Sequence, residues 1–382
     1  MRLLHLADLH LGWAPRDLPV ASAEARQAAR DARLDEAVGL ALEERVDAVL
    51  IVGDLFERFD PPSTLVQQAR AALGRLVDAG IAVVTVPGNH DELTYPASVY
   101  RREPERWPGV LVRDPMPAHV ARIDVAGELL HVHALAYVGG VTDVREALHR
   151  LPPRDESGRH VFLAHGTLAH GTHAGAAGDA LDERSLPLPR AALAAAGYDY
   201  VALGHLHRPS EQRLGTSLAL YPGCVGGKGF DDPGADAWTI VRLGAHGVDI
   251  ERRPHRGQRL RDLALDVTPF DDAAALEDAV AELVAAASGD IVRVRLTGAA
   301  ATQVDAAALG ERCGASTAYL RVEDRTSAVS EALLDAWEAS PTVRGAFVRR
   351  LRERIDASDD QDERTRLVRA LRLGLDAMAG TR

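Results

Sequence analysis

The sequence predicts an α/β protein built from more than one domain, and three observations indicate this. The chain has 382 residues, which is longer than a typical single domain. It is 46% hydrophobic and 26% charged, a composition typical of a protein that buries a sizeable core. From residue 2 to about residue 90, short apolar runs alternate with long amphipathic segments, as βαβ units in a largely parallel sheet do.

Within this first part, apolar strands are predicted at 2–7, 48–52 and 81–86. The segment 22–45 is rich in alanine and places Leu34 and Val38 four residues apart, which predicts one amphipathic helix between the first two strands. A second helix is expected to begin with Ser63 as its cap and to end at Gly80. The first ninety residues therefore read as strand, helix, strand, helix, strand.

After about residue 110 the predicted elements become shorter. Apolar runs lie at 119–125, 129–135, 160–164, 198–203, 237–243 and 248–253. Because the helical segments between these runs shrink, we expect a mixed sheet or two packed sheets with helices outside.

A polar, arginine-rich stretch near Arg252 marks a domain boundary. We expect a first domain at 1–255 and a small α/β domain at 256–326, with helices near 271–287 and 303–312. Residues 327–382 read as a helical tail. In that tail, apolar residues recur about every four positions and form two amphipathic stripes. The first stripe is Val343, Phe347, Leu351 and Ile355, and the second is Leu367, Leu371, Leu375 and Met378.

The charge and the cysteine content narrow the possible classes of protein and its expected compartment. A formal net charge of −12 argues against a protein that coats nucleic acid with its whole surface. The only cysteines, Cys224 and Cys313, lie too far apart to predict a disulfide framework. No targeting or membrane segment is visible in the sequence, so we expect a cytoplasmic protein that does not interact with membranes.

Five predicted strands end in side chains that bind metals. These side chains are Asp8, His10, Asp54, Asn89, His90, Asp91, His165, His205 and His207. In open α/β sheets, ligands bind beyond the carboxyl ends of the strands, which is where all nine residues fall. Glycines flank four of the five motifs, at positions where the backbone must turn sharply: Gly53, Gly88, Gly166 and Gly204.

A single histidine after a strand is more often a partly buried structural residue than a ligand. His131 and His133 have the same two-residue spacing but lie inside a predicted strand without a neighbouring glycine, so we interpret them as structural. The combination of a strand end with a glycine separates the candidate ligands from such residues and predicts a metal site.

The number of candidate ligands favours two metal ions. Two Asp, one Asn and four His exceed the needs of one ion with four to six ligands. With no thiolate in the set, the nitrogen and oxygen donors suit manganese, iron or zinc. Two ions about 4 Å apart are typical of in-line displacement at phosphorus, in which a water acidified by the metals is the nucleophile.

The series DLH, GDLFE, GNHDE, AHG and GHLH resembles the calcineurin-like metallophosphoesterase superfamily over residues 1 to about 255. The stretches LLHLADLHLG, GDLFERFDPPS, LGHLHRP and YPGC…GKGF are most similar to SbcD-type DNA repair exonuclease subunits. The resemblance implies a βαβ sandwich of mixed sheets, a small α/β capping domain and a helical C-terminal tail.

The same resemblance implies roles for the candidate residues. Asp8, His10 and His207 would hold one divalent ion and Asn89, His165 and His205 the other, with Asp54 bridging both and manganese as the expected metal. His90 would be the catalytic residue that faces the phosphate, and Asp91 would orient it. Two positions differ from the family pattern. Glu57 stands where archaeal and eukaryotic members commonly carry His, and Cys224 where bacterial nucleases usually carry Ser.

The function that this resemblance implies is a two-metal-dependent DNA phosphodiesterase, an exonuclease or endonuclease of DNA repair. Its expected partners are DNA and an SbcC-like coiled-coil ATPase that docks on the tail, and a homodimer is left open. One alternative is a small-molecule phosphodiesterase or phosphatase, for example one that acts on cyclic nucleotides. Another is a DNA-end-binding scaffold protein with a vestigial metal site.

Overall fold

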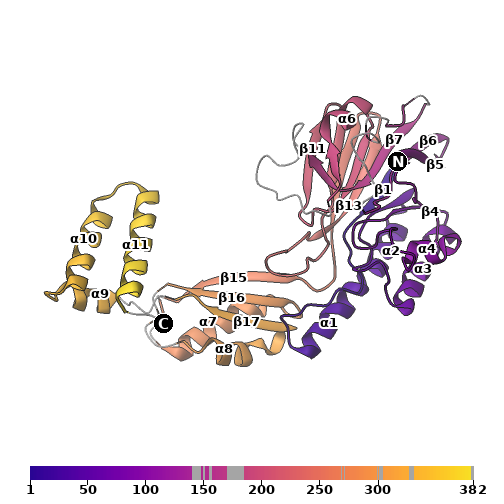
Figure 1. The fold of residues 1–382 in the computed structure, drawn as a ribbon. Coiled ribbons are helices and arrows are strands. Elements are labelled where there is room, and N and C mark those ends of the chain that lie inside the picture. Colours follow the sequence, from indigo (N-terminus) through magenta and orange to yellow (C-terminus); the bar gives the residue numbers. More distant parts are fainter. Residues whose placement is uncertain are drawn as a thin grey trace. The chain divides into compact units, whose positions relative to one another are not determined.

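The structure is a computed structural model that describes residues 1–139, 148, 151–154, 157–169, 185–267, 269–270, 272–298, 300, 304–326 and 331–379. It divides into two compact units, Met1–Arg259 and Leu260–Arg382 (Figure 1). Both units combine helices with strands, which confirms the predicted α/β class. The expected three-part division at 255 and 326 stays a prediction. Residue 303 and residues 327–330, where two expected helical segments begin, lie outside the described residues.

The first sheet of unit 1 has the strand order β14-β13-β1-β2-β3-β4. Its strands are β1 (Arg2–Leu6), β2 (Ala48–Val52), β3 (Ala82–Val86), β4 (Val110–Leu111), β13 (Ala237–Gly244) and β14 (Gly247–Pro254). β1 to β4 run parallel, and β13 pairs antiparallel with both β1 and β14. The central strand β2 is buried along its whole length, as its continuous apolar sequence predicts.

The second sheet has the order β11-β12-β10-β7-β6-β5. Its strands are β5 (Ala118–Val125), β6 (Glu128–Ala134), β7 (Arg159–His165), β10 (Tyr200–Gly204), β11 (Ser210–Leu214) and β12 (Ser217–Tyr221). The central strands are parallel and the two outer pairs are antiparallel, so the sheet is mixed as predicted.

The two sheets share one apolar core, which includes Ile51 of the first sheet and Leu163 and Ala202 of the second. A buried hydrogen bond also joins them, between Nδ1 of His5 on β1 and the hydroxyl of Tyr200 on β10, 2.7 Å apart. Burial lowers the pKa of His5 to about 3, so this imidazole is neutral and can share a proton with the phenol at no charge cost. Unit 1 is therefore a sandwich of two sheets.

The predicted helix at 22–45 is wrong in one respect, because two helices, α1 (Val20–Asp31) and α2 (Arg33–Glu43), meet at Ala32. α3 (Ser63–Asp78) also differs at its start. Pro62 occupies the cap position and no side chain caps the helix; Ser63 is already its first residue. Gly80, with φ +78°, ends the helix as predicted, and its N–H donates to the carbonyl of Val77 at 2.9 Å.

The buried face of α1 is made of arginines instead of the expected apolar side chains. Arg26 and Arg30 are at most 1% exposed, and they donate hydrogen bonds to the carbonyls of Gly226 and Gly227. Arg30 also donates to the carbonyl of Leu9 at 2.9 Å. Hydrogen bonds from α1 therefore link the loop that contains Gly226 and Gly227 to the segment that follows β1.

Unit 2 contains a parallel three-stranded sheet and a helical tail. The sheet is formed by β15 (Leu260–Asp266), β16 (Ile291–Thr297) and β17 (Tyr319–Asp324), and α7 (Ala273–Ala285) and α8 (Ala306–Cys313) pack on it. The tail consists of α9 (Glu331–Glu338), α10 (Val343–Ala357) and α11 (Gln361–Ala379). The shorter elements of the chain are α4 (Val99–Arg102), η1 (Pro104–Arg106), β8 (Thr167–Ala169), β9 (Pro187–Pro189), α6 (Arg190–Ala196) and η3 (Gly314–Ser316).

The three tail helices have a core of their own, in which Leu334, Val348, Leu371 and Leu375 are buried. The predicted apolar stripe of α10 is partly used in this packing, whereas Val343 at its start is 81% exposed. Among the described helices, none is both long and apolar enough to cross a membrane.

Replacing Leu375 by Ala should loosen the tail without affecting unit 1. Leu375 is 1% exposed, and removing a buried leucine side chain typically costs about 2–5 kcal/mol. Hydrogen exchange measured by mass spectrometry should become faster in 331–379 and stay unchanged in β1 to β3. Met378→Ala, at a side chain that is 38% exposed, is the matched control. Faster exchange throughout unit 1 would contradict the separate core of the tail.

Candidate metal centre

Backbone hydrogen bonds hold the segments after β1, β2 and β3 side by side. The N–H of Asp8 donates to the carbonyl of Gly53 at 3.1 Å, and that of His10 to the carbonyl of Asp54 at 2.9 Å. Gly53 in turn donates to the carbonyl of Val86 at 2.9 Å. The ladder of the parallel sheet thus continues past the strand ends, and it fixes the polar side chains that follow them.

The backbone at these strand ends is strained. In the described part of the chain, six residues other than glycine have a positive φ, and four of them are predicted ligands. These are Asp8 at 56°, His10 at 49°, Asp54 at 50° and His205 at 104°. Such conformations cost about 1–3 kcal/mol each and cluster at functional sites, where the surrounding structure enforces them. This concentration is independent support for a site at the strand ends.

The flanking glycines make room for the ligands. A Cβ on Gly53 would lie 2.0 Å from Nδ1 of His165, and a Cβ on Gly88 would lie 2.2 Å from Oδ1 of Asp54. Atoms that are not bonded to each other cannot approach this closely. A side chain at either position would therefore displace a candidate ligand.

Asp8, His10 and His207 form one group, with ligand atoms that lie within 4.8 Å of one another. Nδ1 of His10 lies 2.8 Å from Oε2 of Glu57, and Nδ1 of His207 lies 2.5 Å from Oδ2 of Asp232. With its Nδ1 proton directed at Asp232, His207 presents its Nε2 lone pair to Nε2 of His10, which lies 3.1 Å away. Two imidazole nitrogens at this distance can share a proton or a metal cation, so the geometry fits a metal ion.

Asn89, His165 and His205 form a second group. Oδ1 of Asn89 lies 3.0 Å from Nε2 of His165 and 3.2 Å from Nδ1 of His205. The other nitrogen of His165 lies 3.0 Å from the carbonyl oxygen of Val52, to which it donates, so Nε2 is free to bind a cation. These three side chains come from the ends of β3, β7 and β10, and thus from both sheets.

Asp54 lies between the two groups. Its Oδ2 is 3.7 Å from Nε2 of His10 and 3.4 Å from Nε2 of His165, while its Oδ1 accepts a hydrogen bond from the backbone N–H of His90 at 2.8 Å. A carboxylate in this position can contribute to both ion sites. The structure thus brings together all seven residues predicted as metal ligands.

The electrostatics of the centre indicate that it attracts positive charge. Burial raises the pKa of Asp8. Burial by itself would raise the pKa of Asp54 and lower that of His165. The attraction between the Asp54 carboxylate and the His165 imidazolium outweighs this effect of burial. The pKa of Asp54 is therefore lowered, and that of His165 is raised to about 9, with Asp8 adding to the latter shift. Buried carboxylates that draw protons onto neighbouring imidazoles would draw metal cations in the same way.

His90 and Asp91 follow Asn89 but make different contacts. His90 is partly exposed, and its Nδ1 lies 3.0 Å from the carbonyl oxygen of Glu57. Asp91 is fully buried and accepts hydrogen bonds from the N–H groups of Gly88 and Phe56 and from the hydroxyl of Tyr100. Burial raises the pKa of Asp91 to about 6. These contacts tie Asp91 to the backbone of the loop that carries His90.

Sequence reasoning assigned no role to three charged residues that lie at the centre, which are Glu57, Asp232 and Lys228. Nζ of Lys228 lies 2.9 Å from Oε2 of Glu57. Two signals were available in the sequence: Glu57 directly follows the GDLF motif, and Lys228 is the chain's only lysine. The spacing of more than 170 residues between them gives no indication of contact.

The histidines interpreted as structural lie away from the centre. Nδ1 of His131 contacts His119 at 3.2 Å, and Nε2 of His133 contacts His160 at 3.0 Å. The rings of His131 and His160 stack with a centroid distance of 4.6 Å. No group of three candidate metal ligands within the described ranges includes any of these four rings.

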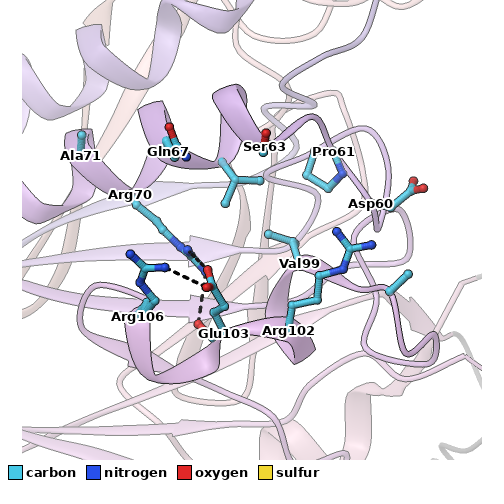
Figure 2. Close-up of a pocket in the computed structure, with 12 residues that line it drawn as sticks. Asp60, Pro61, Ser63, Gln67, Arg70, Ala71, Val99, Arg102, Glu103 and Arg106 are labelled. Atoms are coloured by element: carbon cyan, nitrogen blue, oxygen red, sulfur yellow. Dashed lines mark hydrogen bonds and ion pairs between the residues drawn. The ribbon is translucent and has the colours of Figure 1, made fainter.

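A pocket of about 430 Å³ beside α3 is lined by none of the predicted ligands. Figure 2 shows two of its three arginines, Arg70 and Arg106, directed at Glu103. Nη1 of Arg70 lies 2.6 Å from one oxygen of Glu103, and Nη1 of Arg106 lies 2.8 Å from the other. Because Glu103 balances the charge of two of the three guanidinium groups, the pocket is a poor anion site.

Replacing Gly88 by Ala should weaken metal binding. The new methyl group would displace Asp54, which lies between the two groups of ligands, so we expect an affinity loss of about 10- to 100-fold. Titration calorimetry with Mn²⁺ measures this affinity. Gly74→Ala, on α3 with open space around its Cβ, is the matched control. Unchanged affinity in Gly88→Ala would exclude Asp54 from the metal site.

Several known proteins are similar to this chain in sequence. It is 28% identical over 272 residues to the SbcD component of the nuclease SbcCD of Bacillus subtilis, a match that covers 63% of this chain and 66% of that protein. It is 31% identical over 269 residues to the DNA double-strand break repair protein Mre11 of Aeropyrum pernix, covering 67% and 62%. With the uncharacterized metallophosphoesterase YhaO of Bacillus subtilis it shares 24% identity over 309 residues, covering 78% and 72%.

The matches to the SbcD and Mre11 proteins span slightly less than two thirds of those relatives' lengths. Residues 1–209, more than half of the chain, match the calcineurin-like phosphoesterase family. This segment contains all the predicted ligands and both catalytic candidates. The chain belongs to the calcineurin-like phosphoesterase family.

Proposed function

We propose that this protein is a two-metal-dependent DNA phosphodiesterase, an exonuclease or endonuclease of DNA repair. The observation that carries the proposal is the convergence of seven nitrogen and oxygen ligands from five strand ends, with Asp54 between two groups of three. Two adjacent cation sites of this kind suit in-line displacement at phosphorus. Related proteins named as a nuclease and as a DNA break repair protein support DNA as the substrate.

In this proposal Asp8, His10 and His207 hold one ion, and Asn89, His165 and His205 the other, with Asp54 shared. Divalent ions bound there would polarise the phosphate and lower the pKa of a bound water. We expect manganese, with iron and zinc as alternatives, because all the donors are nitrogen or oxygen.

His90 is the proposed catalytic residue. Its Nδ1 can donate to the carbonyl of Glu57, which leaves Nε2 of the partly exposed ring to face the substrate. When water attacks phosphorus and the bond to the departing oxygen breaks, that oxygen needs a proton or a positive charge. The imidazolium of His90 can provide either, and Asp91 fixes the loop that carries it.

The helical tail is the proposed docking element for an SbcC-like coiled-coil ATPase. α10 and α11 pack as a hairpin against α9, and the largely exposed Val343 begins the predicted apolar stripe. This self-contained packing supports a module that can bind a partner while unit 1 stays folded. A cytoplasmic location belongs to the same proposal.

Two other functions fit the same centre less well. A small-molecule phosphodiesterase or phosphatase would use the same metals, but the additional unit 2 and its tail favour a larger substrate or partner. A scaffold with a vestigial centre is disfavoured by the complete ligand set and by the strain that four ligands retain.

His90→Gln should retain both metals and lose most of the rate. General acid catalysis or charge stabilisation at the phosphate typically contributes about 10²- to 10⁴-fold, and glutamine cannot supply a proton at neutral pH. The assay is Mn²⁺-dependent digestion of single-stranded DNA and of a small phosphodiester, with metal content measured in parallel. Digestion at the wild-type rate would exclude a catalytic role for His90. Activity on the small ester alone would favour the small-molecule alternative.

Removing residues 327–382 should separate nuclease activity from partner binding. Since the tail core is distinct from the other cores, metal-dependent cleavage of single-stranded DNA should persist, whereas co-purification with the ATPase and ATP-stimulated digestion of duplex ends should disappear. The full-length protein is the control. A truncated chain that unfolds, or that binds the ATPase as tightly as the full-length protein, would contradict docking by the tail.

A further inference from the structure

The segment 222–235, here called the glycine loop, brings two charged side chains to the metal centre. It folds back on itself, because the N–H of Lys228 donates to the carbonyl of Asp232 at 2.9 Å. Gly226 and Gly227 adopt φ values of +70° and +57°, and a Cβ on Gly227 would lie 2.3 Å from the carbonyl oxygen of Pro233. Only glycine fits at such a position, so the loop has a defined shape.

Two buried arginines hold the glycine loop in place. Arg26 donates to the carbonyls of Gly226 and Gly227, and Arg30 donates to that of Gly227. Hydrogen bonds from charged donors are stronger than neutral ones, and here they are shielded from water. The residue that follows Gly227 is Lys228, so the anchored backbone restricts where its ammonium group can lie.

One oxygen of Glu57 is the common neighbour of three side chains. Its Oε2 lies 2.8 Å from Nδ1 of His10, 2.9 Å from Nζ of Lys228 and 3.8 Å from Nδ1 of His90. Lys228, the proposed catalytic imidazole and a predicted metal ligand therefore all lie within 4 Å of the same carboxylate oxygen. Asp232, from the same loop, contacts the second imidazole of that metal group, His207.

The type of residue at position 228 also points to a specific role. It is the only lysine among 44 basic residues. Its ammonium group lies 5.7 Å from the centre of the Trp13 ring, and the side chain is 15% exposed. An ammonium group is a compact point charge that can turn toward a phosphate oxygen, whereas a planar guanidinium needs a wider, fork-shaped partner.

Resting on the proposed function, we propose that Lys228 binds a non-bridging oxygen of the scissile phosphodiester next to His90. In this arrangement Glu57 is a positioning residue whose carboxylate contacts Nδ1 of His10 and keeps the ammonium group in place while no substrate is bound. A fixed positive charge aimed at the phosphate stabilises the charge that develops on its oxygens during displacement. Lys228 therefore acts on the substrate, and Glu57 acts on the metal ligand.

The test compares Lys228→Met, Lys228→Arg and Glu57→Ala with the wild-type full chain. Mn²⁺ affinity is measured by calorimetry, and hydrolysis of bis(p-nitrophenyl) phosphate gives kcat and KM. Arg75→Met is the matched control, because it removes one positive charge from an exposed ion pair with Asp35 on the same unit. Thermal unfolding verifies that each variant folds, and Lys228→Gln replaces Lys228→Met if that variant does not.

Lys228→Met should lower kcat/KM about 100-fold, as the loss of one preorganised charge donor does, while Mn²⁺ affinity stays the same or rises. Lys228→Arg should restore part of the rate. Glu57→Ala should instead weaken Mn²⁺ binding by about 10- to 100-fold, as the loss of a partner to a metal-bound histidine typically does. Arg75→Met should match the wild type in both measurements.

Two results would overturn the inference while the proposed function stands. In the first, Lys228→Met hydrolyses the ester at the wild-type rate. In the second, it weakens Mn²⁺ binding as much as Glu57→Ala does, which would make Lys228 a structural partner of Glu57. A wild-type protein that binds Mn²⁺ but hydrolyses no phosphodiester, DNA included, would instead refute the proposed function and this inference with it.

Discussion

The burial of negative charge at the ends of the strands is the constraint on which the rest of the structure depends. Asp8 and Asp54 are at most 2% exposed, at a place where an unbalanced carboxylate is very costly. Imidazoles from both sheets face these carboxylates, and metal cations would complete the balance. The strained backbone and the glycines serve this arrangement, because they allow the side chains to meet.

Around this centre the chain adds a second layer of charged groups. Glu57 and Asp232 contact the Nδ1 atoms of His10 and His207, and the hydrogen bond with Asp232 sets the direction of the His207 ring. Asp232 belongs to a loop that Arg26 and Arg30 fasten to the first helix. Contacts therefore link segments from residue 8 to residue 232, and the glycine loop is connected to the predicted metal ligand His207 through Asp232.

Much of the fold and of the site could be predicted because both follow local rules. Apolar runs predict the strands, and the carboxyl ends of parallel strands meet at one edge, so the ligands after β1, β2 and β3 could be grouped from the sequence alone. Contacts between distant segments could not be predicted in this way. Glu57 meets Lys228 across 171 residues, and the buried face of α1 consists of arginines, which hydrophobic periodicity does not anticipate. The helix break at Ala32 has no glycine or proline to signal it.

A crystal structure determined with Mn²⁺, with the ions located by anomalous scattering, is the most direct test of the two-metal centre. We expect two neighbouring peaks, one bound by Asp8, His10 and His207 and the other by Asn89, His165 and His205, with Asp54 in contact with both. A single peak, or ions bound away from these side chains at saturating Mn²⁺, would contradict the two-metal centre.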